Sequence, residues 1–391
     1  MADNSSNQIR IKVENVSKIF GPDPKAAMAA VEGGMGKAEL LESSNHVLGL
    51  HAINLDIRQG ETFVIMGLSG SGKSTLIRHF NRLIEPTAGR ILVDGEDVLK
   101  LGKSALREFR RKKISMVFQR FALLPHKTVL ENVIYGLLID GMAKPKARER
   151  GMEQIELVGL GGFEQHYPGQ LSGGMQQRVG LARALATDAE ILLMDEAFSA
   201  LDPLIRHDMQ MQLREIQARL HKTIVFITHD LDEALLLGNH IAILKDGMLR
   251  QVGTGAGILI APADEYVARF VRDVNRARIV TCGALAEPKP IYDSPQAASG
   301  DSGWVIISDG HGGHGLMRAG SKHDSNTSGI EAAITIDASA NVEEAFGALS
   351  RRDRPLMVMS EGRISGLLGW QTVLRALERS NEAEHKPPLS N

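Results

Sequence analysis

Short apolar segments and amphipathic segments alternate along the first 245 residues. Apolar and polar residues take turns from Ile9 to Val13 and again from 50 to 57, the period of two that is typical of a strand. Residues 62–66 (TFVIM) are a short apolar run that ends at a glycine and predicts another strand. The same patterns predict strands at 89–93, 114–118, 190–195, 223–228 and 240–244, and helices at 73–84, 128–138, 145–158, 174–187, 203–220 and 231–238. This alternation predicts an α/β domain with a largely parallel sheet.

Some segments depart from the alternation. Residues 21–46 start with a turn (GPDPK) and continue as short helical stretches with glycine breaks. Residues 284–329 are expected to form turns and loops, although 304–317 weakly resemble 356–369, which leaves a divergent tandem open. The last residues, 380–391, are expected to be a disordered tail. In the compact segment 331–378, strands are predicted at 334–337, 355–360 and 364–369, and helices at 341–352 and 372–380.

Composition and charge exclude several classes of protein. A chain of 391 residues holds two or three domains at roughly 100–200 residues each. Its 45 basic and 47 acidic residues give a formal net charge of −2, which argues against a protein that coats nucleic acid. A single cysteine, Cys282, rules out an intrachain disulfide and a cysteine zinc cage, in agreement with a reducing compartment. We expect neither a membrane span nor a secretory signal, so work at a membrane would need a second chain.

Residues 67–75 (GLSGSGKST) match the phosphate-loop pattern GxxxxGK[ST] between a predicted strand and a predicted helix. Glycines let backbone N–H groups curl around phosphates, and the helix N-terminus adds positive partial charge. We expect Lys73 to reach the β- and γ-phosphates and the Ser74 hydroxyl to hold Mg²⁺. The alternative, a chance Gly/Ser loop, does not explain the flanking elements. The predicted nucleotide-binding residues are Gly67, Ser69, Gly70, Ser71, Gly72, Lys73, Ser74 and Thr75.

Two acidic residues follow the apolar strand predicted at 190–195. Asp195 and Glu196 emerge at the carboxyl end of that strand, where such sheets bind their ligands. Asp195 is placed for Mg²⁺, and Glu196 is placed to act as the general base on an attacking water. Alone, such a pair is more often a helix cap or a surface pair. Together with the phosphate loop, it favours hydrolysis of a nucleoside triphosphate.

The sequence LSGGMQQR at 171–178 is a further motif, because Ser-Gly-Gly at a helix start forms a second anion-binding end. Together these motifs resemble the nucleotide-binding subunits of ABC transporters, whose signature LSGGMQQR is intact here. Gln119 in VFQRFALLPH resembles the Q-loop glutamine, Asp202 in SALD the D-loop, and His229 in FITHD the switch histidine. Phe20 resembles the aromatic residue that stacks on adenine, with core packing as the alternative.

The resemblance implies a mechanism and a set of roles. In the family, the signature of one subunit closes on ATP held by the phosphate loop of the other, which implies a homodimer that sandwiches two ATP. It implies that Glu196, His229 and Gln119 are catalytic, and that Ser74, Gln119 and Asp195 hold Mg²⁺. The further residues that it places at the nucleotide are Phe20, Ser172, Gly173, Gly174, Gln177 and Asp202.

Two weaker features have ordinary explanations. His311, His314 and His323 stand among glycines, where a metal site is conceivable and a surface loop is more common. The basic stretch 107–113 (REFRRKK) is suited to lipid headgroups or a partner, and a solvated helix face is the simpler interpretation.

Other branches of the ABC family fit less well. One ATPase unit disfavours the tandem type that acts on ribosomes, and the absence of a coiled coil between the motifs disfavours the chromosome-maintenance type. The insert at 21–49, the sequence VIMGLSGSGKSTLIRHFNRLIEPTAGRILVDGED, and a CBS-like segment at 331–378 resemble the ATPases of quaternary-amine importers for glycine betaine, choline or proline betaine. The alternatives are an importer for another small solute such as an amino acid, or a non-transport ABC ATPase.

The resemblance also implies a domain plan. We expect an ABC ATPase at 8–275, with a RecA-like core, an antiparallel β subdomain and a helical subdomain at about 121–187. A small α+β CBS-like regulatory domain follows at 278–378, with a degenerate first copy. The implied partners are integral membrane permease subunits and, indirectly, a periplasmic solute-binding protein. The implied location is the cytoplasmic face of a bacterial inner membrane.

Overall fold

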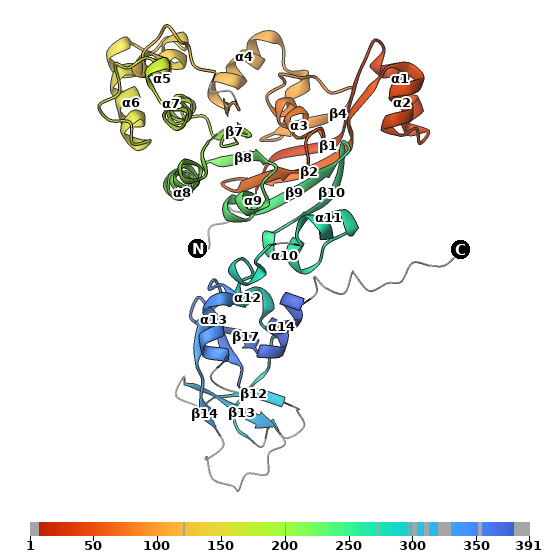
Figure 1. The fold of residues 1–391 in the computed structure, drawn as a ribbon, viewed down its shortest axis with the longest axis vertical. Helices are drawn as coiled ribbons and strands as arrows, with labels where there is room; N and C mark the ends of the chain where they lie inside the picture. Colours follow the sequence, from red (N-terminus) through yellow and green to blue (C-terminus); the bar gives the residue numbers. More distant parts are fainter. Residues whose placement is uncertain are drawn as a thin grey trace. The chain divides into compact units, whose positions relative to one another are not determined.

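The computed structural model describes residues 8–119, 122–199, 201–272, 274–295, 297–298, 303–308, 313–319, 330–350 and 354–378. The chain divides into two compact units, 1–254 and 255–391 (Figure 1). The helices α10 (Gly255–Ile260) and α11 (Glu265–Phe270) therefore group with the second unit, whereas the sequence placed them at the end of the first. The tail expected at 380–391 lies outside the described residues.

The first unit is built on a six-stranded sheet with the order β10-β9-β3-β8-β7-β6. The strands from β9 to β6 run parallel, and β10 pairs antiparallel with β9 at one edge. Every residue of β3, β7 and β8 is buried, which explains their continuous apolar sequences. The sequence did not predict β10, whose residues are half-exposed. The bounds are β3 Thr62–Met66, β6 Ile114–Val117, β7 Ile191–Asp195, β8 Thr223–Thr228, β9 His240–Lys245 and β10 Met248–Gly253.

A four-stranded antiparallel sheet, in the order β2-β1-β4-β5, packs over this core and is the expected β subdomain. Buried Ile11 and Ile53 from this sheet share one hydrophobic cluster with Phe63 and Leu193 from the six-stranded sheet. Its bounds are β1 Ile9–Phe20, β2 Val47–Arg58, β4 Ala88–Val93 and β5 Glu96–Asp97.

The helices of this unit agree with the predicted ones within a few residues, with one clear exception. The helix predicted at 73–84 ends at Phe80, because the chain leaves the helical region and Arg82 has a φ of +52°. The basic stretch 107–113 lies on α4, where Arg110 donates to the carbonyls of Asn81 and Arg82 and so is not purely solvated. The helices are α3 Lys73–Phe80, α4 Lys103–Lys112, α5 Val129–Ile139, α6 Lys144–Leu157, α7 Gly173–Ala186, α8 Pro203–Leu220 and α9 Leu231–Leu237, with 3-10 turns at 98–100 and 168–170.

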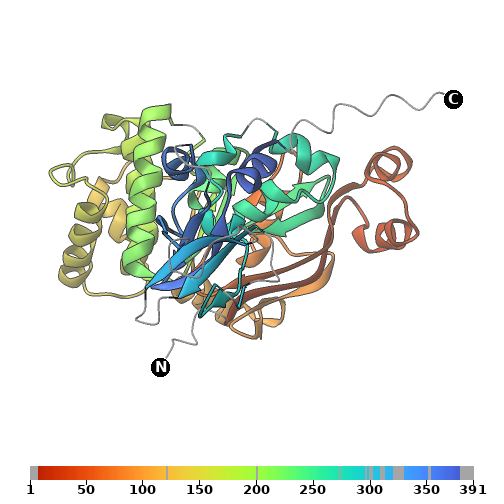
Figure 2. The same ribbon diagram turned by 90° about the horizontal axis from the view of Figure 1, so that it is seen from below.

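The insert after β1 forms two short helices, α1 (Pro24–Glu32) and α2 (Lys37–Ser44), as expected. We call residues 21–46 the α1–α2 hairpin. Helices α5, α6 and α7 pack on one another and form the expected helical subdomain. Figures 1 and 2 show this subdomain and the α1–α2 hairpin at opposite ends of the first unit.

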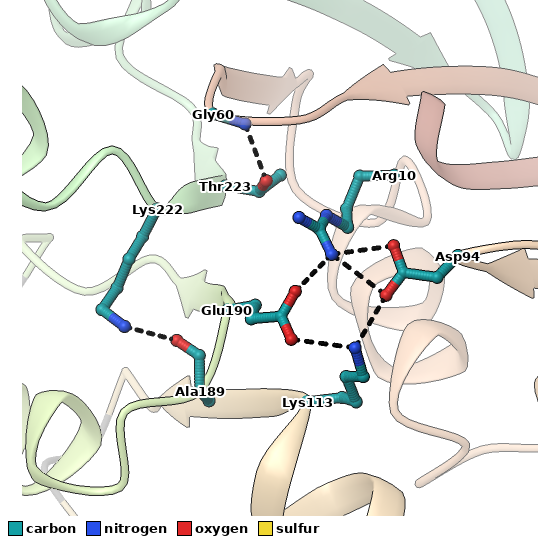
Figure 3. A network of polar contacts seen from close by, with 8 residues as sticks. All are labelled: Arg10, Gly60, Asp94, Lys113, Ala189, Glu190, Lys222 and Thr223. Carbon is teal, nitrogen blue, oxygen red and sulfur yellow. Dashed lines mark hydrogen bonds and ion pairs between the residues drawn. The ribbon is translucent and has the colours of Figure 1, made fainter. Parts of the chain in front are cut away.

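A network of charges joins the two sheets of the first unit at the amino-terminal ends of β6 and β7 (Figure 3). The guanidinium of Arg10 on β1 donates to Asp94 at 2.8 Å and also to Glu190. Lys113 bonds to the same two carboxylates, at 3.1 Å and 2.8 Å. Opposite charges therefore alternate around the four residues, and the side chain of Arg10 is only 10% exposed.

The second unit contains two small sheets, β11-β12-β13-β14 and β15-β16-β17. In each, a short strand pairs parallel with the next strand, which pairs antiparallel with the third. Residues 284–329 thus contain strands, and the prediction of turns and loops alone was wrong. Gly and Pro residues around the apolar run 304–307 hid these strands in the sequence. The bounds are α12 Cys282–Leu285, β11 Ile291–Tyr292, β12 Gly303–Ser308, β13 His314–Ala319, β14 Glu331–Ala332, β15 Thr335–Asp337, α13 Val342–Leu349, β16 Leu356–Ser360, β17 Arg363–Leu368 and α14 Trp370–Glu378, with a 3-10 turn at 276–278.

The two sheets of the second unit share a core formed by Ile306 and Leu316 with Met357 and Leu367. His311 and His323 lie outside the described residues. The described part of the chain holds no group of three metal-ligating side chains. Within the same described ranges, no helix is long and apolar enough to cross a membrane.

Candidate active site

Four neighbouring strands bring the predicted site residues to one edge of the six-stranded sheet. The loop 67–75 follows β3, Gln119 follows β6, Asp195 ends β7 with Glu196 after it, and His229 follows β8. Because β3, β8, β7 and β6 are parallel and adjacent, their carboxyl ends meet at the same edge.

The loop between β3 and α3 is held close to the backbone of neighbouring strands. A Cβ at Gly67 would lie 2.3 Å from the carbonyl oxygen of Leu244, and one at Gly72 would lie 2.6 Å from that of Gly49. Both glycines also have positive φ, +149° and +103°, so no other residue fits these positions without strain. The close approach explains why the motif needs glycine at these positions.

Lys73 folds back over the loop that precedes it. Its ammonium donates to the carbonyls of Gly67 at 2.8 Å and Leu68 at 3.1 Å. Burial lowers the pKa of Lys73, and the nearby Glu196 carboxylate opposes that shift. The hydroxyl of Ser71 is buried and has no hydrogen-bond partner among the described residues. A buried donor without a partner fits a bound phosphate oxygen, because an unpaired polar group costs free energy.

Asp195 is buried and forms two polar contacts to α3. The Ser74 hydroxyl donates to its Oδ1 at 2.8 Å, and Arg78 Nη2 donates to its Oδ2 at 3.0 Å. Arg78 is a site residue that the sequence analysis missed. The available signal was its spacing of four residues from Ser74, which places both on one helix face.

Glu196 is the point where separate segments of the chain converge. Its carboxylate accepts a hydrogen bond from Gln119 Nε2 at 2.9 Å and lies 3.6 Å from Lys73 Nζ and 3.8 Å from His229 Nδ1. The φ of Glu196 is +47°, a conformation that costs a non-glycine residue about 1–3 kcal/mol and tends to occur at functional sites. All three predicted catalytic residues therefore lie together beside the phosphate loop.

The signature motif lies at the start of α7. Ser172 caps this helix by accepting a bond from the Met175 N–H at 3.3 Å. A Cβ at Gly174 would lie 2.4 Å from Ile205 Cγ2, so α7 and α8 require glycine there. Gln177 is fully buried, and its amide has no partner among the described residues.

The signature forms no polar contact to the phosphate loop among the described residues of the chain. Among the described residues, no hydrogen bond or ion pair joins 172–177 to 67–75 or to Glu196. Exposed Asp202 is the N-cap residue of α8, and the Ser199 hydroxyl ties the preceding turn to the carbonyl of Glu196 at 2.9 Å.

Phe20 ends β1, and the residue is 39% exposed rather than part of the core. The ammonium of Lys18 lies 5.0 Å from the centre of the ring, and a Cβ at Gly49 would lie 2.8 Å from its Cε2. The ring is accessible to a planar ligand, and Lys18 is a cation beside it that sequence spacing alone did not single out.

A phosphate loop on a parallel sheet, an antiparallel β subdomain and a helical subdomain that carries LSGGMQQR define a P-loop ATPase of the ABC type. Residues 50–199 match the family model described as "ABC transporter". The chain belongs to the ABC transporter family, among its ATP-binding subunits that hydrolyse ATP.

The relatives support this assignment over most of the chain. The chain is 55% identical over 293 residues to the glycine betaine transport ATP-binding protein OpuAA of Bacillus subtilis, covering 74% of this chain and 70% of that protein. It is 43% identical over 386 residues to the glycine betaine/carnitine transport ATP-binding protein GbuA of Listeria monocytogenes, covering 94% and 97%. The solved dimer of the ATP-binding cassette MJ0796 with ADP and Pi has a TM-score of 0.53 at 35% identity, covering 62% of this chain and 98% of that one.

Proposed function

We propose that this chain hydrolyses ATP to power the import of quaternary ammonium compounds such as glycine betaine, proline betaine or choline. The observation that carries this proposal is the similarity to GbuA, because it extends through both compact units. The Escherichia coli ProV, named for glycine betaine and proline betaine, is 51% identical over 72% of this chain. The MetN protein of Staphylococcus haemolyticus, named for methionine, is 46% identical over only 58% of it.

The roles at the site follow from its geometry. Backbone N–H groups of the loop and the Lys73 ammonium would bind the β- and γ-phosphates by charge-assisted hydrogen bonds. The Glu196 carboxylate would take a proton from water as the water oxygen bonds to the γ-phosphorus and the bond to the β-phosphate oxygen breaks. Gln119 and His229, both beside Glu196, would orient that water.

The residues around Asp195 fit a magnesium ion. Ser74 Oγ and Asp195 Oδ1 lie 2.8 Å apart, and oxygen donors are the ligands that Mg²⁺ prefers. Gln119 commits its Nε2 to Glu196, and its amide oxygen is the atom that would serve as a third ligand. A bound Mg²⁺ would neutralise charge on the β- and γ-phosphates.

We further propose that the chain acts as a homodimer. Within one chain, no hydrogen bond or ion pair among the described residues links the signature to the phosphate loop, and the cap at Ser172 leaves an exposed helix N-terminus. The signature of one subunit would complete the ATP site of the other. The proposal is supported by the solved structure of MJ0796, a bacterial ABC transporter cassette, which is dimeric.

The proposed partners follow from the family. The dimer would dock on integral permease subunits at the cytoplasmic face of a bacterial inner membrane, with a periplasmic binding protein that presents the solute. Residues 278–378 would form a CBS-like regulatory pair, supported by the repeated strand pattern of its two sheets.

The substrate proposal is tested by transport. The chain is reconstituted in proteoliposomes with the permease encoded beside it, and uptake of labelled glycine betaine and methionine is measured with ATP inside. Glycine betaine uptake that the Lys73→Ala variant abolishes is the expected result. Uptake of methionine instead of glycine betaine would show the alternative, an amino-acid importer.

The regulatory proposal is tested by truncation. A chain that ends at Val274 removes both small sheets. It also removes the segment 276–280, which bonds to the helices of the same unit, for example from Arg276 to the Ala376 carbonyl of α14 at 3.1 Å. We expect ATP hydrolysis to persist and the response of transport to salt to disappear. An unchanged salt response would assign the region to dimerisation or stability instead.

A further inference from the structure

The α1–α2 hairpin is a rigid insert rather than a loose loop. Its helices bury Ala27, Val31 and Leu40 against Ile19 and Leu48, which belong to the paired ends of β1 and β2. Apolar burial of this kind fixes the helices on the strands, even though most of their surface is polar.

The base of the hairpin is closed by His46, which is 8% exposed. A Cβ at Gly21 would lie 2.3 Å from the His46 ring, so the glycine lets the imidazole pack against the chain directly after Phe20. His46 Nδ1 lies 2.8 Å from the Ser44 carbonyl, and Nε2 accepts the Asp23 N–H at 3.2 Å. The hairpin is thereby fixed at the point where it leaves β1.

This rigid hairpin places one lysine on the phosphate loop. Lys37, the first residue of α2, donates from its ammonium to the Gly70 carbonyl at 3.2 Å. Among the hydrogen bonds of the described residues, this is the one that joins the hairpin to residues 67–75. Gly70 has a φ of +76°, and a Cβ there would have no neighbour within 4 Å, so the loop is open and unsupported by packing at this point.

The contact engages the carbonyl side of one peptide group in the phosphate loop. The Gly70 carbonyl accepts from Lys37, and the N–H of the same peptide, at Ser71, donates to Leu68 at 3.2 Å. A glycine peptide without side-chain support turns over readily. A carbonyl turned toward the bound anion would repel it, because phosphate is recognised by N–H groups.

We propose that Lys37 is a positioning residue for the nucleotide and that the α1–α2 hairpin serves to hold it there. By binding the Gly70 carbonyl, Lys37 keeps the phosphate loop in the conformation that binds a triphosphate. The loop then loses less conformational entropy when the nucleotide binds. The inference rests on the proposed nucleotide site at residues 67–75. It assigns a task to the 21–46 insert, which the mechanism above does not use.

The test compares lysines in the same hairpin. Lys37→Ala removes the contact, Lys37→Arg keeps a cationic donor, and Lys25→Ala removes an exposed lysine of α1 with no bond to the loop among the described residues. For the full chain, we would measure the Kd of a fluorescent ATP analogue with Mg²⁺, together with KM and kcat for ATP hydrolysis. Thermal unfolding shows whether each variant is folded.

We expect Lys37→Ala to raise Kd and KM about two- to fivefold with kcat within about twofold, since one exposed charged contact changes an equilibrium constant by a factor of that order. Lys37→Arg should recover most of the affinity, and Lys25→Ala should match the wild type. Unchanged Kd in Lys37→Ala, or equal losses in Lys37→Ala and Lys37→Arg, would overturn the inference. If Lys73→Ala also binds the analogue as the wild type does, the nucleotide site itself is wrong.

Discussion

Gln119 and Glu196 are 77 positions apart in the chain, yet the Gln119 amide donates to the Glu196 carboxylate at 2.9 Å. The contact exists because Gln119 follows β6 and Glu196 follows β7, and these strands are parallel neighbours. It places the proposed general base next to a residue that leads into the helical subdomain, where α5 begins at Val129.

Replacing Glu196 by Gln is expected to preserve ATP binding and to lower steady-state hydrolysis by about 10²–10⁴-fold. The amide has the size of the carboxylate but cannot accept the proton of the attacking water. The measurements are phosphate release and nucleotide affinity on the same preparation. Hydrolysis close to the wild-type rate in Glu196→Gln would remove Glu196 from the role of general base.

The signature is tested by Ser172→Arg, with Ser172→Ala as its control. Both lose the cap on the Met175 N–H, but only arginine adds bulk and charge at the helix end that the partner's ATP would contact. We expect Ser172→Arg to retain ATP affinity and to lose hydrolysis by about 10²-fold or more, whereas Ser172→Ala loses much less. Full hydrolysis by a strictly monomeric chain would contradict the shared site.

The charge network of Figure 3 predicts a stability effect. Arg10→Leu would leave the carboxylates of Asp94 and Glu190 together with only Lys113 to balance them. We expect a loss of about 1–3 kcal/mol in the free energy of unfolding, less than for a fully buried network because Glu190 and Lys113 are 43% and 41% exposed.

The matched control for that network is Arg90→Ala, which breaks the exposed pair between Arg90 and Glu14 on the same sheet. Surface pairs of this kind stabilise little, so the urea midpoint should barely move. Equal effects of Arg10→Leu and Arg90→Ala would show that the network contributes no more than an ordinary surface pair.

His79 predicts a pH dependence of stability. Burial lowers its pKa to about 4, which outweighs its bond from Nδ1 to the Thr75 carbonyl. Because the unfolded chain binds the proton at a pKa near 6.5, stability falls as the pH drops from about 6.5 toward 4. Between pH 7 and pH 5 this residue should account for a loss of about 2 kcal/mol.

The measurement is urea unfolding of wild type and His79→Asn at pH 7 and pH 5. Asparagine keeps a donor for the Thr75 carbonyl but cannot take a proton in this range. The wild type should lose more stability than the variant over the same interval. Parallel losses in both proteins would assign the acid sensitivity to other groups.

The local sequence was sufficient for most elements of the first unit and for the chemical motifs of this protein. Apolar runs predicted β3, β7 and β8, because strands buried on both faces must be apolar throughout. The motif at 67–75 predicted its own backbone, because glycine is required where the chain approaches Leu244 and Gly49. Residue type and spacing over about ten positions are therefore enough to predict both a buried strand and a phosphate loop.

The tertiary structure decided which distant residues meet. Arg78 reaches Asp195, Arg10 joins Asp94 to Glu190, and Lys37 bonds to Gly70. Local spacing can place Arg78 on the helix face of Ser74, but it does not name the distant partner in any of these contacts. Each partner is set by the strand order or, for Lys37, by the path of an insert. Likewise, β12 and β13 pair only because the second unit gives their short apolar runs a shared core with β16 and β17. Contacts between distant segments gain their free energy only after the sheets have formed. The local sequence therefore predicts which side chains carry chemistry, and the tertiary structure determines which of them contact each other.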